Sequence, residues 1–198
     1  LLLGDLMLET VCQQLKVFNS KAIDGFSIAV NISSEQFTEA LVDRLDYLIS
    51  KYDLLPQQIG LEITESVAMK AIDSNLKLLE IFRERGHKIS VDDFGTGYSS
   101  LAYLKRFPLD TIKIDRAFIQ ELAVDTDDFI IAKAIIDLGH SLGLKIVAEG
   151  VETQAQMKLL QELGCDLGQG FYFQKASTGE MISSCYERGL PLGRAQTL

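Results

Sequence analysis

The sequence predicts an α/β fold, and within that class a TIM-like parallel (β/α) barrel in which about six of the eight strands are present. Short, continuously apolar segments alternate with longer segments whose apolar residues recur at helical spacing. Strands that are apolar throughout are typical of a parallel sheet covered by helices. Each predicted strand also ends in a polar residue, and in such barrels the functional residues come from the carboxyl ends of the strands.

Six segments have the composition of buried strands: 26–32, 59–64, 88–91, 111–114, 145–148 and about 168–173. The segments between them show helical periodicity. Leu8, Val11, Cys12 and Leu15 form one apolar face, and Phe37, Leu41, Leu45 and Leu48 form another.

Local signals mark where the helices begin and end. Ser33 with Gln36, and Thr153 with Gln156, have the spacing of a capping box and predict the first turn of a helix. Three glycines follow helical segments, where a left-handed residue commonly ends a helix. They are Gly86, Gly143 and Gly164.

An open, doubly wound sheet is the competing architecture. Its dinucleotide-binding form needs the pattern GxGxxG after the first strand. Gly95 and Gly97 come close to this pattern, but Ser100 stands where the last glycine would be. The polar strand ends therefore favour the barrel.

The totals suit a single domain spanning residues 1–198, because 198 residues match one α/β domain. A formal net charge of −9 disfavours a nucleic-acid polymer as partner. Cys12, Cys165 and Cys185 include no CxxC pair, so we expect neither disulfides nor structural zinc. A reducing compartment follows. We expect the chain in the cytoplasm, either free or as the cytoplasmic part of a membrane-attached protein.

The polar residues at the strand ends are of types that bind metal ions. They are Asn31, Glu62, Asp92, Asp93, Lys113, Glu149 and Gln169. Taken alone, Asn31, Asp92, Asp93 and Gln169 could be cap or turn residues, and Asp115 reads as the cap of a short helix at 117–122. Lys113 alternates with apolar neighbours, so we expect it to pair with an acid. Glu65 reads as a cap or a supporting residue. Six successive strand ends with such residues are hard to explain by structure alone.

Carboxylate and amide oxygens are hard ligands and favour Mg²⁺ or Mn²⁺. Neither His87 nor His140 ends a strand, which disfavours a zinc site. Several acids at one barrel mouth can hold two divalent ions ~3.5–4 Å apart, an arrangement used for attack on phosphodiesters. Lys113 could position the attacking water. The loop 95–100 could close over the site or bind phosphate with its backbone N–H groups.

In these stretches the chain resembles the EAL-domain cyclic-di-GMP phosphodiesterases. The matching stretches are 30–33 (VNIS), 61–66 (LEITES), 92–101 (DDFGTGYSSL), 113–115 (KID), 148–152 (AEGVE) and 169–170 (QG). The resemblance implies a TIM-like barrel that hydrolyses cyclic di-GMP to linear pGpG, using Mg²⁺ or Mn²⁺, and we expect two ions. It also implies a homodimer.

The resemblance assigns roles to individual residues. The implied metal ligands are Asn31, Glu62, Asp92, Asp93 and Glu149. The implied catalytic residues are Lys113 on the attacking water, Glu149, and Glu65, which anchors the loop after Asp93. Gln169, Thr96, Gly97 and Glu152 are implied as residues of the substrate site and its loop.

The chain departs from the family in its upstream part. The signature Glu-Ala-Leu motif, whose glutamate is a metal ligand, is absent. We expect the missing strands to precede Leu1 and the natural protein to extend upstream, with sensor or cyclase-like domains. A smaller departure is Lys175-Ala176, where the family often has Lys-Pro.

Two other functions stay open at this point. A catalytically inactive cyclic-di-GMP receptor would share the fold, and it gains if the upstream glutamate is missing. Degenerate members usually lose acids at these positions, and none is lost here. An unrelated barrel that binds sugar phosphates lacks support from Lys113 and the paired aspartates.

Overall fold

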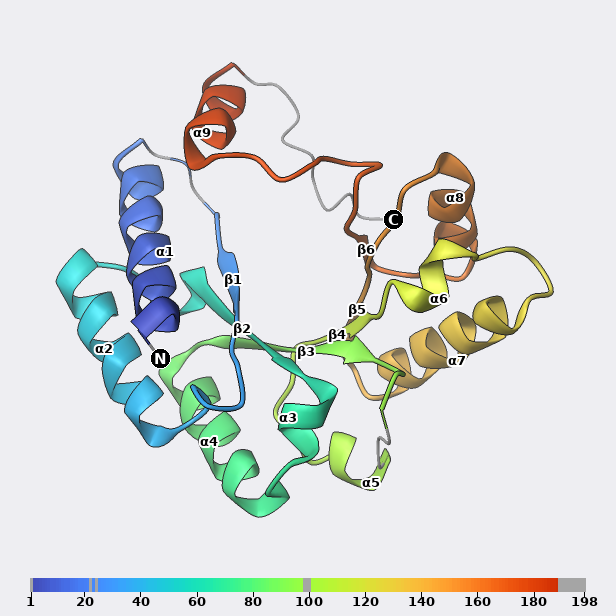
Figure 1. The fold of residues 1–198 in the computed structure, drawn as a ribbon, viewed down its shortest axis with the longest axis horizontal. Helices are drawn as coiled ribbons and strands as arrows, with labels where there is room; N and C mark the ends of the chain where they lie inside the picture. Colours follow the sequence, from blue (N-terminus) through green and yellow to red (C-terminus); the bar gives the residue numbers. More distant parts are fainter. Residues whose placement is uncertain (1, 22, 24, 98–100, 189–198) are drawn as a thin grey trace. The chain divides into compact units, whose positions relative to one another are not determined.

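The structure is a computed structural model that describes residues 2–21, 23, 25–97 and 101–188 (Figure 1). The end of the predicted loop 95–100, namely Tyr98, Ser99 and Ser100, lies outside the described residues. Backbone contacts divide the chain into two compact units. Unit 1 contains residues 1–90 and 100–108, and unit 2 contains residues 91–99 and 109–198.

Six strands are hydrogen-bonded in the order in which they occur in the sequence. They are β1 (Ile28–Asn31), β2 (Ile59–Thr64), β3 (Lys88–Phe94), β4 (Thr111–Ile114), β5 (Lys145–Ala148) and β6 (Leu167–Gly168). The pairs β1–β2, β4–β5 and β5–β6 are parallel. The predicted fold class, α/β with six parallel strands, is confirmed.

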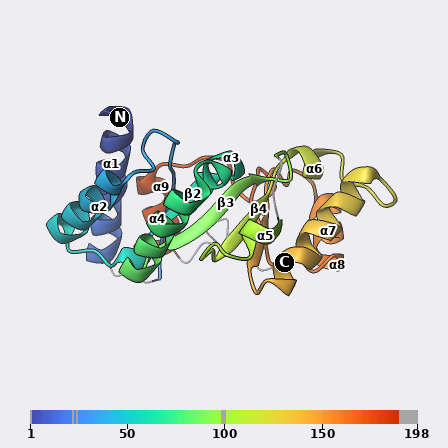
Figure 2. The ribbon, with the colours of Figure 1, turned by 90° about the horizontal axis from the view of Figure 1, so that it is seen from below.

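Unit 1 surrounds β1 and β2 with helices. These are α1 (Leu2–Ser20), α2 (Glu39–Tyr52), the 3₁₀ helix η1 (Pro56–Gln58), α3 (Glu65–Met69), α4 (Ile72–Arg85) and α5 (Leu101–Leu104). α1 lies beside α2 (Figures 1 and 2). The predicted apolar face of α1 is buried at Leu8, Cys12 and Leu15, and α2 buries Leu45 and Leu48.

A charged cluster joins α1 to α2. The Glu9 carboxylate accepts hydrogen bonds from Lys51 Nζ at 2.5 Å, Tyr52 Oη at 2.9 Å and Arg44 at 3.1 Å. These bonds favour the ionised form, the one from Lys51 most, and they lower the pKa of Glu9 to about 2. The cluster therefore depends on an ionised Glu9.

Unit 2 carries β4, β5 and β6 with α6 (Ala117–Gln120), α7 (Asp127–Ser141), α8 (Gln154–Glu162) and α9 (Gly179–Glu187). Gly139 lets α7 approach β5 closely, because a Cβ there would lie 2.2 Å from Ile146 Cδ1. Both are fully buried or nearly so. Among the described residues no helix is both long enough and apolar enough to cross a membrane.

The predicted capping box at Ser33 and Gln36 is wrong as a helix start. Ser33 N donates to Gln36 Oε1 at 3.3 Å and Gln36 N to Ser33 O at 3.0 Å, so the two residues close an isolated turn. α2 begins later, with Thr38 as its N-cap. Phe37 is buried, as its place on the apolar face predicted, but it precedes the helix.

The last predicted strand, 168–173, is also wrong in extent. β6 is Leu167–Gly168, and the chain then turns, with Phe173 N donating to Gly170 O at 3.1 Å. Gly170 has φ +157, and its α-carbon lies so close to the Val151 backbone that an added Cβ would be 2.2 Å from Val151 O. Apolar composition alone could not reveal this backbone contact. β3, in contrast, extends beyond its predicted end to Phe94.

Candidate metal centre

Three carboxylates converge in unit 2, near the carboxyl ends of its strands. Asp92 and Asp93 lie near the carboxyl end of β3, and Glu149 directly follows β5. One oxygen from each lies within 4.8 Å of the others. The structure therefore brings together three of the five residues predicted as metal ligands.

Lys113 lies between these acids on β4. Its Nζ is 2.6 Å from Glu149 Oε1 and 3.2 Å from Asp92 Oδ1. The side chain is 5% exposed, against 13% for Asp92 and 17% for Glu149. The sequence-based expectation that this lysine pairs with an acid is confirmed. Two of the three carboxylates contact this ammonium group, and three carboxylates beside one ammonium leave an excess of negative charge that attracts cations.

Asp93 adopts a left-handed backbone conformation, with φ +54. Aspartate tolerates this conformation better than most residues. Its N–H donates to Asp92 Oδ1 at 3.1 Å, and its carbonyl accepts from Thr96 Oγ1 at 2.8 Å. The turn therefore directs two consecutive carboxylates into one site.

The pKa of Asp93 is raised above its usual value. Burial is the largest cause, followed by a hydrogen bond with Asp115 and by the negative charges of Asp92 and Asp115, while Lys113 opposes the shift. Asp115 also accepts a hydrogen bond from Ala117 N at 2.7 Å, but the N-cap of α6 is Arg116, one residue after the predicted cap. Sequence reasoning placed Asp115 at the start of this helix but missed its contact with Asp93.

Glu149 is held through its backbone. Its N–H donates to Ile114 O at 3.2 Å, the end of the neighbouring strand. Gly150 follows with φ +70, and a Cβ there would lie 2.7 Å from Arg116 Cβ. Gln169 then joins the same segment, since its N–H donates to Ala148 O at 2.8 Å and its carbonyl accepts from Val151 N at 3.0 Å. These contacts place Gln169, the residue directly after β6, beside the segment that carries Glu149.

The loop residues predicted to act at the site begin directly after β3. Gly95 has φ +100, and a Cβ at this position would lie 2.8 Å from the Phe118 ring and 3.1 Å from Ile135 Cδ1. Thr96 and Gly97 are exposed. The start of the loop thus packs on α6 and α7 while its polar groups face solvent.

Glu152, predicted at the substrate site, lies in unit 2 three residues after Glu149 and is exposed. The other predicted site residues, Asn31, Glu62 and Glu65, lie in unit 1. Asn31 and Glu62 are register partners at the carboxyl end of the β1–β2 pair, where Asn31 is exposed and Glu62 half-buried. Glu65 is the first residue of α3 and is 2% exposed. Their grouping with the carboxylates of unit 2 stays a prediction.

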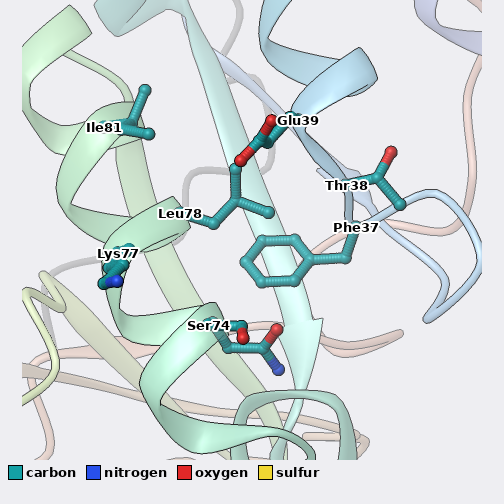
Figure 3. Close-up of a pocket in the computed structure, with 8 residues that line it drawn as sticks. Phe37, Thr38, Glu39, Ser74, Lys77, Leu78 and Ile81 are labelled. Carbon is teal, nitrogen blue, oxygen red and sulfur yellow. The ribbon is translucent and has the colours of Figure 1, made fainter.

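The sequence does contain the tripeptide Glu-Ala-Leu at residues 39–41 in unit 1, but these residues do not end a strand and are not the signature motif. They begin α2, and Glu39 lines a pocket of about 340 Å³ between the start of α2 and α4 (Figure 3). Its floor includes the buried Phe37 and Leu78. Glu39 is the one carboxylate among the residues that line this pocket, so the pocket lacks the ligands of a divalent ion.

The unit 2 cluster fits Mg²⁺ or Mn²⁺ by its chemistry. Its donors are carboxylate oxygens, which hard divalent ions prefer. Asp92, Asp93 and Glu149 lie close enough to share one ion or two neighbouring ions. Among the described residues this cluster contains neither histidine nor cysteine, which disfavours zinc.

Gln156 was recognised from the sequence only as a member of a capping box. Gln156 forms the predicted capping box with Thr153, and it is 7% exposed. Its side chain also donates to the carbonyl groups of Ile119 and Gln120. The capping-box spacing was visible in the sequence, whereas the second pair of bonds was not, because the partners are 36 and 37 residues away.

Known proteins share this fold and these motifs. The chain is 46% identical over 181 residues to MucR of Pseudomonas aeruginosa, a bifunctional diguanylate cyclase/cyclic di-GMP phosphodiesterase. The match covers 91% of this chain and 26% of MucR. The chain therefore spans about a quarter of that relative's length.

Solved structures agree. The MucR phosphodiesterase in complex with c-di-GMP superimposes with a TM-score of 0.86, covering 91% of this chain and 79% of that one. The EAL domain of Mycobacterium smegmatis DcpA gives a TM-score of 0.89 at 34% identity, covering 96% and 85%. Klebsiella pneumoniae BlrP1, in a complex with manganese and cy-diGMP, gives 0.75 at 30% identity, covering 85% and 43%.

The family model of the EAL domain matches residues 1–176 of this chain. The strand order, the acidic cluster and the solved structures are consistent with that match. The six parallel strands are thus part of the TIM-barrel-like fold of these domains. The chain belongs to the EAL domain family.

Proposed function

We propose that this chain is the catalytic domain of a metal-dependent phosphodiesterase that hydrolyses cyclic di-GMP to linear pGpG. One observation carries the proposal: the buried Lys113 ammonium contacts the carboxylates of Asp92 and Glu149, beside Asp93. The substrate class comes from the family, whose members MucR and BlrP1 have structures with this dinucleotide. Those facts concern the relatives and support the proposal for this chain.

Asp92, Asp93 and Glu149 would hold Mg²⁺ or Mn²⁺, with Asn31 and Glu62 proposed as further ligands from their places in the family motifs. A bound divalent ion lowers the pKa of water and neutralises phosphate charge. The excess of carboxylates over ammonium groups at the centre would attract such an ion.

The chain's own groups would handle the water and its proton. Lys113 Nζ holds the attacking water and orients it toward phosphorus. Glu149 Oε1, 2.6 Å from that nitrogen, is placed to accept a proton. The water oxygen bonds to phosphorus, one phosphodiester P–O bond breaks, and the leaving ribose oxygen takes up a proton. One cleavage opens the ring and yields pGpG.

Other residues keep supporting roles in this proposal. Gln169 lies beside the Glu149 segment, where its amide could contact substrate. Thr96 and Gly97 offer exposed polar groups to phosphate. Glu65 is proposed to anchor the loop after Asp93.

The deciding experiment incubates the full-length protein with cyclic di-GMP and Mn²⁺ and follows pGpG by chromatography. We expect pGpG to form, and the reaction to stop when the divalent ion is chelated. Tight binding of cyclic di-GMP without pGpG would refute the enzyme and support a receptor. Asp92→Ala supplies the inactive control, because it removes a central carboxylate.

We also propose a homodimer, as the family resemblance implies. Val124 and Ile130, near the start of α7, are about 60% exposed, and Ile131 is 37% exposed. Such side chains together suit contact with a second copy. Ile135 on the same helix packs near Gly95, which follows the paired aspartates. Sedimentation should show a dimer that Ile130→Lys weakens, and a wild-type protein that stays monomeric at all concentrations would contradict this.

A further inference from the structure

Gln156 makes more hydrogen bonds than a capping box requires. Its Oε1 accepts from Glu152 N at 2.8 Å and from Thr153 N at 2.9 Å, which is the capping-box contact. Its Nε2 donates to Ile119 O at 2.9 Å and to Gln120 O at 3.0 Å. This buried amide therefore joins two segments that are distant in the sequence.

The first segment carries Glu149. Between Glu149 and Thr153 the backbone is held at several points: Glu149 N donates to Ile114 O and Val151 N donates to Gln169 O. The bonds from Gln156 hold the last two residues, Glu152 and Thr153. Without them, the segment that follows the Glu149 carboxylate would lose its anchor at one end.

The second segment leads back to Asp93. Ile119 and Gln120 are the last residues of α6, and Asp115, which lies just before this helix, accepts a hydrogen bond from its first residue, Ala117. Asp115 is hydrogen-bonded to the Asp93 side chain. One amide therefore connects, through a chain of hydrogen bonds, the supports of two carboxylates that lie within 4.8 Å of each other.

We propose that Gln156 is a positioning residue that holds Glu149 and Asp93 at the separation that binds the divalent ion. The inference rests on the proposed function, because it assumes that these carboxylates hold the ion. Residues that orient metal ligands from behind commonly change metal affinity or activity by 10–100-fold when they are replaced. Methionine is close to glutamine in length and shape but lacks all four hydrogen bonds.

The test compares the full-length wild type with Gln156→Met and with Gln161→Met, an exposed glutamine on the same helix. We expect Gln156→Met to weaken Mn²⁺ binding about 10-fold or more, measured by electron paramagnetic resonance of free Mn²⁺. kcat should fall by a similar factor while KM changes little. Amide exchange should accelerate at Glu152 and Thr153. Gln161→Met should match the wild type in each measurement.

If Gln156→Met folds, is less stable and still binds Mn²⁺ as tightly as the wild type, the proposal is overturned. The hydrogen bonds of Gln156 would then only stabilise the fold. If this variant does not fold, Gln156→Glu decides, because its carboxylate still accepts from Glu152 and Thr153 but cannot donate to α6. Unchanged Mn²⁺ affinity in Gln156→Glu would again overturn it. A wild type that binds Mn²⁺ without forming pGpG refutes the proposed function, while the ratio of Mn²⁺ affinities still decides the role of Gln156.

Discussion

Replacing Lys113 by methionine separates the roles of charge and metal at the proposed centre. The ammonium lies 2.6 Å from Glu149 and 3.2 Å from Asp92. With an effective dielectric constant of about 20, each contact is worth roughly 5–6 kcal/mol of Coulomb energy, much of it offset by desolvation. Removing one partner of a buried ion pair costs about 3–5 kcal/mol.

The lower end, about 3 kcal/mol, applies here because both acids keep some contact with water. For a chain of this length that corresponds to a melting temperature roughly 6–12 °C lower without metal. Mn²⁺ should raise the melting temperature of Lys113→Met more than that of the wild type, because no ammonium then competes with the ion. kcat should still fall on the order of 10²-fold or more, since the group proposed to hold the water is gone.

Two assays check this reasoning: melting curves with EDTA or Mn²⁺, and pGpG formation at saturating substrate. Lys133→Met, at an exposed lysine in a helical pair with Asp137, is the matched control and should behave like the wild type. Wild-type kcat in Lys113→Met would refute the proposed role in handling water. Weaker Mn²⁺ binding in that variant would refute the electrostatic reasoning.

Three further predictions address the metal centre, the α1–α2 cluster and the α7–β5 contact. Asp92→Asn should weaken Mn²⁺ binding and turnover together, because it removes a charged ligand of the ion. Calorimetry measures the binding, and pGpG formation measures the turnover. Glu9, with its pKa lowered by Lys51, should contribute stability above about pH 4.5 that is lost as the pH falls toward 2, and urea unfolding of Glu9→Gln should lack this loss. Gly139→Ala should cost about 1 kcal/mol by urea unfolding, because crowding against Ile146 exceeds the gain in helix propensity.

Each of these has an outcome that contradicts it. Undiminished Mn²⁺ affinity in Asp92→Asn would remove this residue from the ligand set. Parallel pH profiles for the wild type and Glu9→Gln would show that the ionised carboxylate does not stabilise the α1–α2 contact. A Gly139→Ala variant more stable than the wild type would mean that Ile146 moves aside at little cost.

The limits of a strand were predictable where polar residues flank an apolar segment on both sides. β2, β4 and β5 match their predicted limits. The spacing of Ser33 and Gln36 could not distinguish the start of a helix from an isolated turn, because both bring residues three apart into contact. In the structure their contact closes a turn before α2. β6 was predicted too long because its end depends on the close approach of Gly170 to the Val151 backbone, a contact between segments that composition does not encode.

The candidate site divides along the same line. Asp92, Asp93, Lys113 and Glu149 were predictable as neighbours, because the carboxyl ends of parallel strands lie at the same edge of a sheet. The sequence by itself therefore determined the fold class, the family and the identity of these residues. Residue types and spacing carry that information, since each strand exposes its last side chains at that edge.

The tertiary structure alone decided how these residues are held. It showed that one buried ammonium contacts two carboxylates, that Asp93 turns into the left-handed region, and that Gln156 spans 37 residues to reach Ile119. Such contacts depend on distances between segments packed together in space. The spacing of residues along the chain sets which side chains are near the centre, but packing sets which atoms meet.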